Sequence, residues 1–166
     1  MTQKPYNGIW PVAPTPFLPT GAVDYNGMKR VLDLMIDQGV DGICILANFS
    51  EQFLISDAER ERLTRVSLEH VAGRIPVIVT ISHFATDIVV GRAQFAKQLG
   101  AAMVMMMAPY HGALLKGTAQ QTYQQVDAVG GRQRDADRAR ADGEHDDLGD
   151  ARRIRGCCGT AEGGRL

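Results

Sequence analysis

Cysteine and long apolar runs are scarce in this chain of 166 residues. Of its 3 cysteines, Cys44 lies in an apolar run and Cys157 and Cys158 are adjacent, which excludes a disulfide framework. No apolar run reaches the roughly 18 residues that a membrane span needs, so none is expected. The N-terminus lacks a basic and then apolar signal pattern, and we therefore expect a cytoplasmic protein.

An excess of charge of one sign is also missing, because 18 basic and 19 acidic residues give a net charge of −1. This balance argues against a nucleic-acid module that binds through a basic surface. No pair of histidines or carboxylates has metal-ligand spacing, so no metal is expected. No Gly-x-Gly-x-x-Gly or Gly-Lys-Ser/Thr motif indicates a nucleotide cofactor. The apolar content of 45% suffices for one domain with a real core.

The composition changes abruptly after residue 130. In residues 131–166, 16 of 36 residues are charged, against 21 of the 130 before them, and no aromatic residue or apolar period is present. We therefore expect a folded domain over 1–130 and a disordered Arg/Asp/Gly/Ala tail over 131–166. Such a mixture is also typical of a GC-rich gene read out of frame, so the alternatives are a frameshifted terminus and a natural disordered tail. A basic RNA-binding tail is disfavoured, because its 8 positive and 8 negative charges cancel.

Residues 1–130 alternate between short apolar segments and helical patterns. The apolar segments begin near residues 8, 42, 75 and 102 and read as buried strands. Each precedes a stretch with apolar residues at helical spacing. The expected helix starts are Asp24, Ser56 with Glu59 in a capping box, Thr86 or Asp87, and Thr118 with Gln121. The fourth pattern dissolves after Val126.

This alternation predicts an α/β fold with a parallel sheet, because continuous apolar strands need cover on both faces. A period of roughly thirty residues matches one βα unit. A doubly wound sheet and a (βα)8 barrel both fit, and about four of the eight units of a barrel are legible.

In either architecture, ligands bind in the loops after the carboxyl ends of the strands. We expect Asn48 and Ser50 to hold a carboxylate or keto oxygen, and Tyr110 and His111 to orient a substrate or relay protons. Glu51 is expected to tie its own loop to the next helix. His83 is expected to be satisfied by local hydrogen bonds. The candidate substrate-binding residues are Thr15, Asn48, Phe49, Ser50, Tyr110 and His111.

The loop residues carry a family resemblance. The blocks 8–17 (ending Pro-Thr-Pro-Phe), 42–51 and Pro109-Tyr110 resemble the dihydrodipicolinate synthase / N-acetylneuraminate lyase family, over roughly residues 7–125. The resemblance implies a (βα)8 TIM barrel, of which this chain carries the N-terminal half. It also implies a small 2-keto acid substrate, no cofactor, and full-length relatives that form homo-oligomers. The family loop that usually reads Gly-Thr-Thr-Gly-Glu is Ala47-Asn-Phe-Ser-Glu51 here.

Further blocks at 45–53, 69–80, 82–83 and 109–113 are similar to the L-2-keto-3-deoxyarabonate dehydratases, a sugar-acid branch of this family. This similarity implies that a lysine amine condenses with the 2-keto group of the substrate to form a Schiff base. Proton loss beside that carbon then allows water to leave and gives a semialdehyde of 2-oxoglutarate.

In the family this lysine lies on strand six and a catalytic tyrosine lies near the end of strand five, and neither has a counterpart here. The lysines of this chain are Lys4, Lys29, Lys97 and Lys116. No catalytic residue is therefore assigned, and we expect a truncated and inactive lyase-family chain. The alternatives are another aldolase or synthase of the family that acts on pyruvate, a non-catalytic half barrel, and a doubly wound binding domain.

Overall fold

The computed structural model describes residues 6–108 and 118–141, with side chains as far as residue 131. The chain divides into two units, Met1–Gln133 and Arg134–Leu166.

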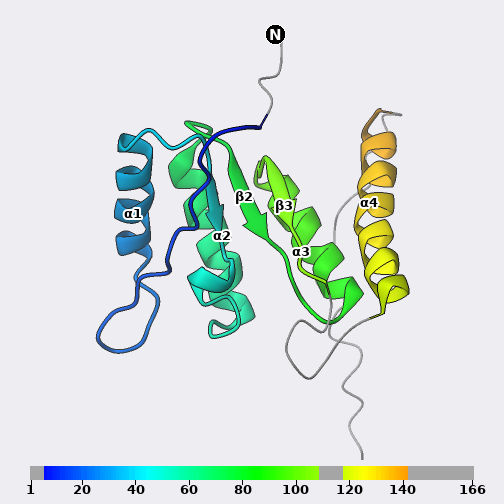
Figure 1. The fold of residues 1–166 in the computed structure, drawn as a ribbon, viewed down its shortest axis with the longest axis horizontal. Helices are drawn as coiled ribbons and strands as arrows, with labels where there is room; N and C mark the ends of the chain where they lie inside the picture. Colours follow the sequence, from blue (N-terminus) through cyan, green and yellow to red (C-terminus); the bar gives the residue numbers. More distant parts are fainter. Residues whose placement is uncertain (1–5, 109–117, 142–166) are drawn as a thin grey trace, which may run out of the picture. The chain divides into compact units, whose positions relative to one another are not determined.

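Strands and helices alternate along the chain as the sequence predicts. The three strands pair in parallel in the order β1-β2-β3, with Ile43 opposite Val77 and Ile78 opposite Met103 (Figure 1). The elements are α1 (Tyr25–Asp37), β1 (Ile43–Ile45), the short 3-10 helix η1 (Asn48–Ser50), α2 (Asp57–Val71), β2 (Val77–Thr80), α3 (Thr86–Gln98), β3 (Met103–Met105) and α4 (Ala119–Ala141). The predicted α/β class with a parallel sheet is thus confirmed.

The first predicted strand is shorter than expected. Val12 forms a single parallel bridge with Cys44, supported by a 2.8 Å bond from Ala13 N to Cys44 O and a 2.9 Å bond from Cys44 N to Pro11 O. The backbone groups of residues 11 and 13 face β1, and Pro11 has no N–H to donate, so the ladder is not continued on the N-terminal side of this bridge. The segment therefore occupies a strand position beside β1 without forming a regular strand.

The core lies on one face of the sheet. Ile43 and Ile45 of β1 and Val77 and Val79 of β2 belong to a single buried apolar cluster. The helices contribute Met28, Leu32, Leu63, Leu68, Val71, Val89, Ala93 and Ala96 to the same cluster. Because side chains alternate along a strand, Cys44 and Ile78 lie on the opposite face. The helices α1, α2 and α3 therefore bury the same face of the sheet.

Helices α1, α2 and α3 begin where the sequence predicts. Asp24 accepts a 2.8 Å bond from Gly27 N, and Ser56 and Glu59 form the expected capping box. The prediction that α3 begins at Thr86 or Asp87 is confirmed, since its first residue is Thr86, and Ala85 occupies the N-cap without a side-chain bond. The first turn of α3 therefore lacks the side-chain acceptor that α1 and α2 have.

The helix α4 begins as predicted but is longer than expected. Thr118 and Gln121 bond reciprocally, with Gln121 N donating to Thr118 Oγ1 over 3.2 Å and Thr118 N to Gln121 Oε1 over 2.8 Å. The helix then continues to Ala141, beyond Val126, where the apolar pattern dissolves. Alanine, arginine and glutamine favour the helix even where no apolar face repeats. Residues 142–166 lie outside the described part, and the boundary at residue 130 stays a prediction.

An ion-paired cluster joins α1 to α2. Asp33 Oδ1 lies 2.8 Å from both His70 Nε2 and Arg74 Nη2. The hydrogen bond from Arg74, and then that from His70, holds the pKa of the Asp33 carboxyl below its usual value. In the residues that the structure describes, no helix is both long and apolar enough to cross a membrane.

Candidate functional site

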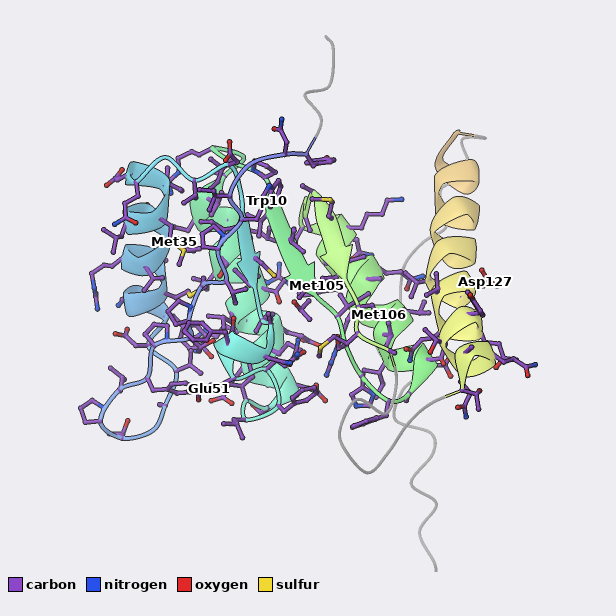
Figure 2. The ribbon with its side chains drawn as sticks, in the orientation of Figure 1. Trp10, Met35, Glu51, Met105, Met106 and Asp127 are labelled. Carbon is purple, nitrogen blue, oxygen red and sulfur yellow. The ribbon has the colours of Figure 1, made fainter. Side chains whose placement is uncertain are left out.

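Polar side chains collect where the parallel strands end. The loops that follow the bridge segment, β1, β2 and β3 meet at one edge of the sheet, because all four segments run in the same direction. We call these segments the carboxyl-end loops: residues 13–16, 46–52, 81–85 and 106–108. Figure 2 shows Glu51 and Met106 in two of them. This is the edge at which α/β proteins bind ligands.

Thr15 and Ser50 join the first two loops. Thr15 Oγ1 donates a 2.8 Å hydrogen bond to Ser50 O, and Ser50 Oγ donates a 2.6 Å bond to Ala13 O. Ser50 Oγ also accepts from Ala47 N over 3.2 Å, and Ser50 N donates to Ala47 O over 2.9 Å. All the polar groups of Ser50 are therefore engaged within the protein. A direct contact of Ser50 with substrate stays a prediction that needs one of these bonds to open.

Asn48 and Phe49 are the exposed members of η1. Phe49 is 72% exposed, and Asn48 is exposed in the same turn. The Asn48 amide contacts two neighbours: Oδ1 accepts a 2.7 Å bond from Gln52 Nε2, and Nδ2 lies 3.6 Å from Met107 Sδ. Asn48 thus bridges the loop after β1 to the loop after β3.

Glu51 closes η1 through its backbone rather than its side chain. It adopts the left-handed conformation with φ 57°, its N–H donates to Asn48 O over 3.0 Å, and its carbonyl accepts from Leu54 N over 2.8 Å. The side chain is exposed. A loop role for Glu51 stays our interpretation, and the backbone geometry supports it.

Ser82 and His83 connect the loop after β2 to its neighbours. Ser82 Oγ accepts a 2.9 Å bond from Met107 N, and His83 O accepts a 3.2 Å bond from Gln125 Nε2 of α4. His83 Nδ1 accepts a 2.9 Å bond from Ala85 N. Burial, and then the nearby Arg92, lowers the pKa of His83, which favours the neutral ring. The ring nitrogen that faces Ala85 is therefore the unprotonated one.

Two arginines that the sequence analysis did not single out, Arg60 and Arg92, donate hydrogen bonds to backbone carbonyls in and beside these loops. Arg60 of α2 is only 4% exposed; Nη1 donates to Thr80 O over 3.1 Å and Nη2 to Gln52 O over 2.7 Å. Arg92 of α3 donates from Nη1 to Ser82 O over 2.6 Å and from Nη2 to Asp57 Oδ1 over 2.7 Å. Burial, and then repulsion by Arg92, lowers the pKa of Arg60 to about 10, at which it is still a cation at neutral pH.

The spacing of the apolar residues along α2 indicates that Arg60 is buried. The buried positions of this helix recur at helical spacing and are Arg60, Leu63, Thr64, Ser67, Leu68 and Val71. Arg60 falls on that buried face, where a charged residue needs polar partners inside the protein. The two carbonyls are those partners.

The remaining candidates are placed as follows. Tyr110 and His111 lie outside the described residues. Across the part of the chain that the structure describes, no group of three or more histidine, cysteine, aspartate or glutamate side chains is arranged to hold a metal ion. The donors of these loops include amides, hydroxyls, the His83 ring and backbone groups, which suit an anionic or carbonyl-bearing organic ligand.

Comparison with known proteins decides the family. The model of the dihydrodipicolinate synthetase family matches residues 5–133, which include all of these loops. The chain belongs to this family. The expected fold is thereby confirmed as the N-terminal half of a (βα)8 barrel, since solved members of the family superimpose on the described elements.

Three similar proteins illustrate the match. Over 111 residues the chain is 60% identical to an L-2-keto-3-deoxyarabonate dehydratase of Azospirillum brasilense. The match covers 67% of this chain and 36% of the dehydratase. It is 31% identical over 124 residues to a probable 2-dehydro-3-deoxy-D-pentonate aldolase of Escherichia coli K12. That match covers 75% of this chain and 41% of the aldolase. The chain also superimposes, with TM-score 0.70 and 26% identity, on a solved prophage protein of the dihydrodipicolinic acid synthase family from Escherichia coli K12 in complex with pyruvate. The superposition covers 75% of this chain and 41% of the prophage protein. The chain thus spans less than half the length of these relatives.

Proposed function

We propose that the carboxyl-end loops form one part of a binding site for a 2-keto acid, in a lyase of the Schiff-base type. The observation that carries this proposal is the Asn48 amide, which is exposed at the carboxyl end of β1 and is held between Gln52 and Met107. Its Nδ2 is a neutral donor beside exposed Phe49, an environment suited to a small carboxylate with an apolar neighbour. The structural relative solved with pyruvate is consistent with this ligand class.

The substrate class that we propose is a 2-keto-3-deoxy sugar acid, and the reaction is its dehydration. Similarity to the L-2-keto-3-deoxyarabonate dehydratase of Azospirillum brasilense supports this choice. In such a reaction a lysine amine condenses with the 2-keto group and releases water, and the resulting imine draws electrons from the neighbouring carbon. That carbon loses a proton, and the hydroxyl on the next carbon leaves as water. Asn48, Phe49 and Thr15, with Tyr110 and His111, would bind and orient the substrate.

We also propose that these 166 residues do not catalyse the reaction alone. Lys29 lies in α1, and Lys97 lies in the last turn of α3, remote from the carboxyl ends of the strands. Lys4 and Lys116 lie outside the described residues. No lysine in the described part therefore follows a strand end, where the imine would have to form. The described residues therefore offer binding groups and no lysine nucleophile at a strand end.

Borohydride trapping tests this pair of claims. The chain is incubated with pyruvate and sodium borohydride, and its intact mass is measured alongside noncovalent pyruvate binding by calorimetry. We expect measurable binding and no added mass. A covalent adduct would contradict the claim of inactivity, and its loss in Lys116→Arg would identify the nucleophile. Absence of pyruvate binding would contradict the keto-acid site.

A second candidate is an aldolase or synthase of the same family that acts on pyruvate. The similarity to the 2-dehydro-3-deoxy-D-pentonate aldolase supports it. Binding of the keto-deoxy acid at least as tightly as pyruvate supports the dehydratase, whereas a clear preference for pyruvate supports the alternative. The cytoplasmic location, homo-oligomeric full-length relatives, and absence of cofactor, nucleic-acid and membrane partners stay predictions.

A further inference from the structure

Gln52 is a buried amide with an unusual set of contacts. It is 2% exposed, and its Nε2 donates a 2.7 Å bond to Asn48 Oδ1. Its Oε1 is buried and has no hydrogen-bond partner among the residues that the structure describes. An apolar side chain of similar length would avoid the cost of this unpaired oxygen. Stability alone therefore does not account for a glutamine at this position.

The backbone of Gln52 is fixed by Arg60. The 2.7 Å bond from Arg60 Nη2 to Gln52 O and the 3.1 Å bond from Nη1 to Thr80 O fasten this loop to the end of β2. No carboxylate among the described side chains lies within ion-pair distance of Arg60. The planar guanidinium reaches both carbonyls at once, which a lysine ammonium on its flexible stem does not reproduce.

These contacts determine which end of the Asn48 amide is available. The Oδ1 atom accepts the bond from Gln52, and the N–H groups of Nδ2 are the donors that the Asn48 amide offers to a ligand. Rotating the Asn48 amide alone by half a turn would place two N–H donors against each other and an oxygen against the Met107 sulfur, which disfavours that orientation beside the present Gln52 amide. The present neighbour of Nδ2 is a thioether at 3.6 Å, which is a weak acceptor. A carboxylate is a much stronger one.

We propose that Gln52 and Arg60 are positioning residues, which hold the Asn48 side chain so that Nδ2 donates to the carboxylate of a 2-keto acid. Arg60 fixes the backbone of Gln52, Gln52 fixes the Asn48 amide, and the ligand carboxylate replaces the Met107 sulfur as acceptor. This inference rests on the proposed function and adds the two residues that determine the orientation of its donor.

Gln52→Met provides the first test, because methionine keeps the length of the side chain and removes both amide atoms. The unpaired Oε1 disappears, so the unfolding midpoint stays equal or rises, whereas the dissociation constant for pyruvate rises about tenfold. A purely structural residue would not separate stability from binding in this way. Gln98→Met, at the exposed end of α3, is the matched control and leaves both quantities unchanged.

A double substitution shows whether Gln52 acts through Asn48. Asn48→Ala alone weakens pyruvate binding, and adding Gln52→Met to it produces no further loss. A further tenfold loss in the double variant would overturn the positioning role, as would unchanged pyruvate binding in folded Gln52→Met. Arg60→Lys weakens binding in the same direction; if it fails to fold, Gln52→Met still decides the question.

A measurement without ligand separates this inference from the proposed function. The side-chain amide signals of Asn48 in a proton–nitrogen NMR spectrum are identified by their loss in Asn48→Ala. Gln52→Met shifts these signals in the absence of pyruvate, and unchanged signals would overturn the positioning role. Failure of the unaltered chain to bind pyruvate would instead overturn the proposed function, and with it the ligand that we assign to Nδ2.

Discussion

The Thr15 hydroxyl donates a 2.8 Å hydrogen bond to the backbone carbonyl of Ser50, 35 residues later in the chain. Thr15 is 7% exposed and Ser50 is 1% exposed, so neither partner is compensated by water if the bond is lost. This contact joins the loop after the bridge segment to η1. The geometry of η1 therefore depends on a residue outside its own βα unit.

Thr15→Val removes this donor and keeps the shape of the side chain. We expect the free energy of unfolding to fall by about 1–3 kcal/mol, because the Ser50 carbonyl is left buried and without its partner. Denaturant unfolding followed by circular dichroism measures the change. Thr20→Val, at an exposed turn, is the control and stays within about 0.5 kcal/mol of the unaltered chain. Equal losses in the two variants would show that the Thr15 bond contributes nothing.

Substitutions at the N-caps of α2 and α3 are expected to change the free energy of unfolding in opposite directions. Ser56→Ala removes the side chain that accepts from Glu59 N, and we expect a loss of about 1 kcal/mol. Ala85→Ser adds an acceptor at an extended, uncapped N-cap, and we expect a gain of about 0.5–1 kcal/mol. Thermal unfolding of both variants tests the pair. Destabilisation by Ala85→Ser would contradict the N-cap assignment of α3.

Two glycine-to-alanine substitutions are expected to change stability in opposite directions, because the space around the two glycines and their secondary structure differ. A Cβ at Gly42 would lie 2.3 Å from Trp10 Cε3, so Gly42→Ala forces the indole to move and costs about 1–3 kcal/mol. A Cβ at Gly91, inside α3, meets no atom within 4 Å, and Gly91→Ala gains up to about 1 kcal/mol from helix propensity. The unfolding midpoints of the two variants should move in opposite directions. Tryptophan fluorescence should change in Gly42→Ala alone.

His83 predicts how stability depends on pH. Burial lowers its pKa in the folded chain below the ordinary value of 6.5, so the unfolded chain binds the proton more readily. The contribution of the neutral ring is therefore present above pH 6.5 and is lost as the pH falls through and below that value. We expect the stability of His83→Gln to fall less steeply than that of the unaltered chain between pH 7 and about 5. Parallel slopes would show that His83 keeps its ordinary pKa.

Local sequence signals predicted most of the fold, because apolar spacing and cap residues act within a few positions. The buried residues Met28 and Leu32 of α1, and Val89 and Ala93 of α3, lie in the helices where their spacing predicts them. The segment around Val12 forms a single bridge instead of the predicted strand, because Pro11 lacks the N–H that would continue the ladder, which an apolar pattern does not show. The extent of α4 was missed because helix propensity, rather than an apolar face, continues it.

The sequence predicted where the candidate site lies, but only some of the contacts within it. Its loops follow apolar strands, so the position of Asn48 could be read from the sequence. The support from Gln52 and Arg60 depends on residues that meet only after α2 packs on the sheet. A helical arginine also reads as a surface residue unless its register with Leu63 and Val71 is noticed. Long-range polar contacts of this kind need the tertiary structure.

The guanidinium of Arg60 binds main-chain oxygens and no carboxylate among the described side chains. Every amino acid offers the same peptide oxygen, so this anchor does not depend on which side chain stands at position 80. A designer who wishes to alter substrate preference could therefore vary exposed Phe49, beside the anchored loop, and keep both contacts of Arg60. A substitution at Arg60 itself would remove hydrogen bonds to Gln52, in the loop after β1, and to Thr80, at the end of β2.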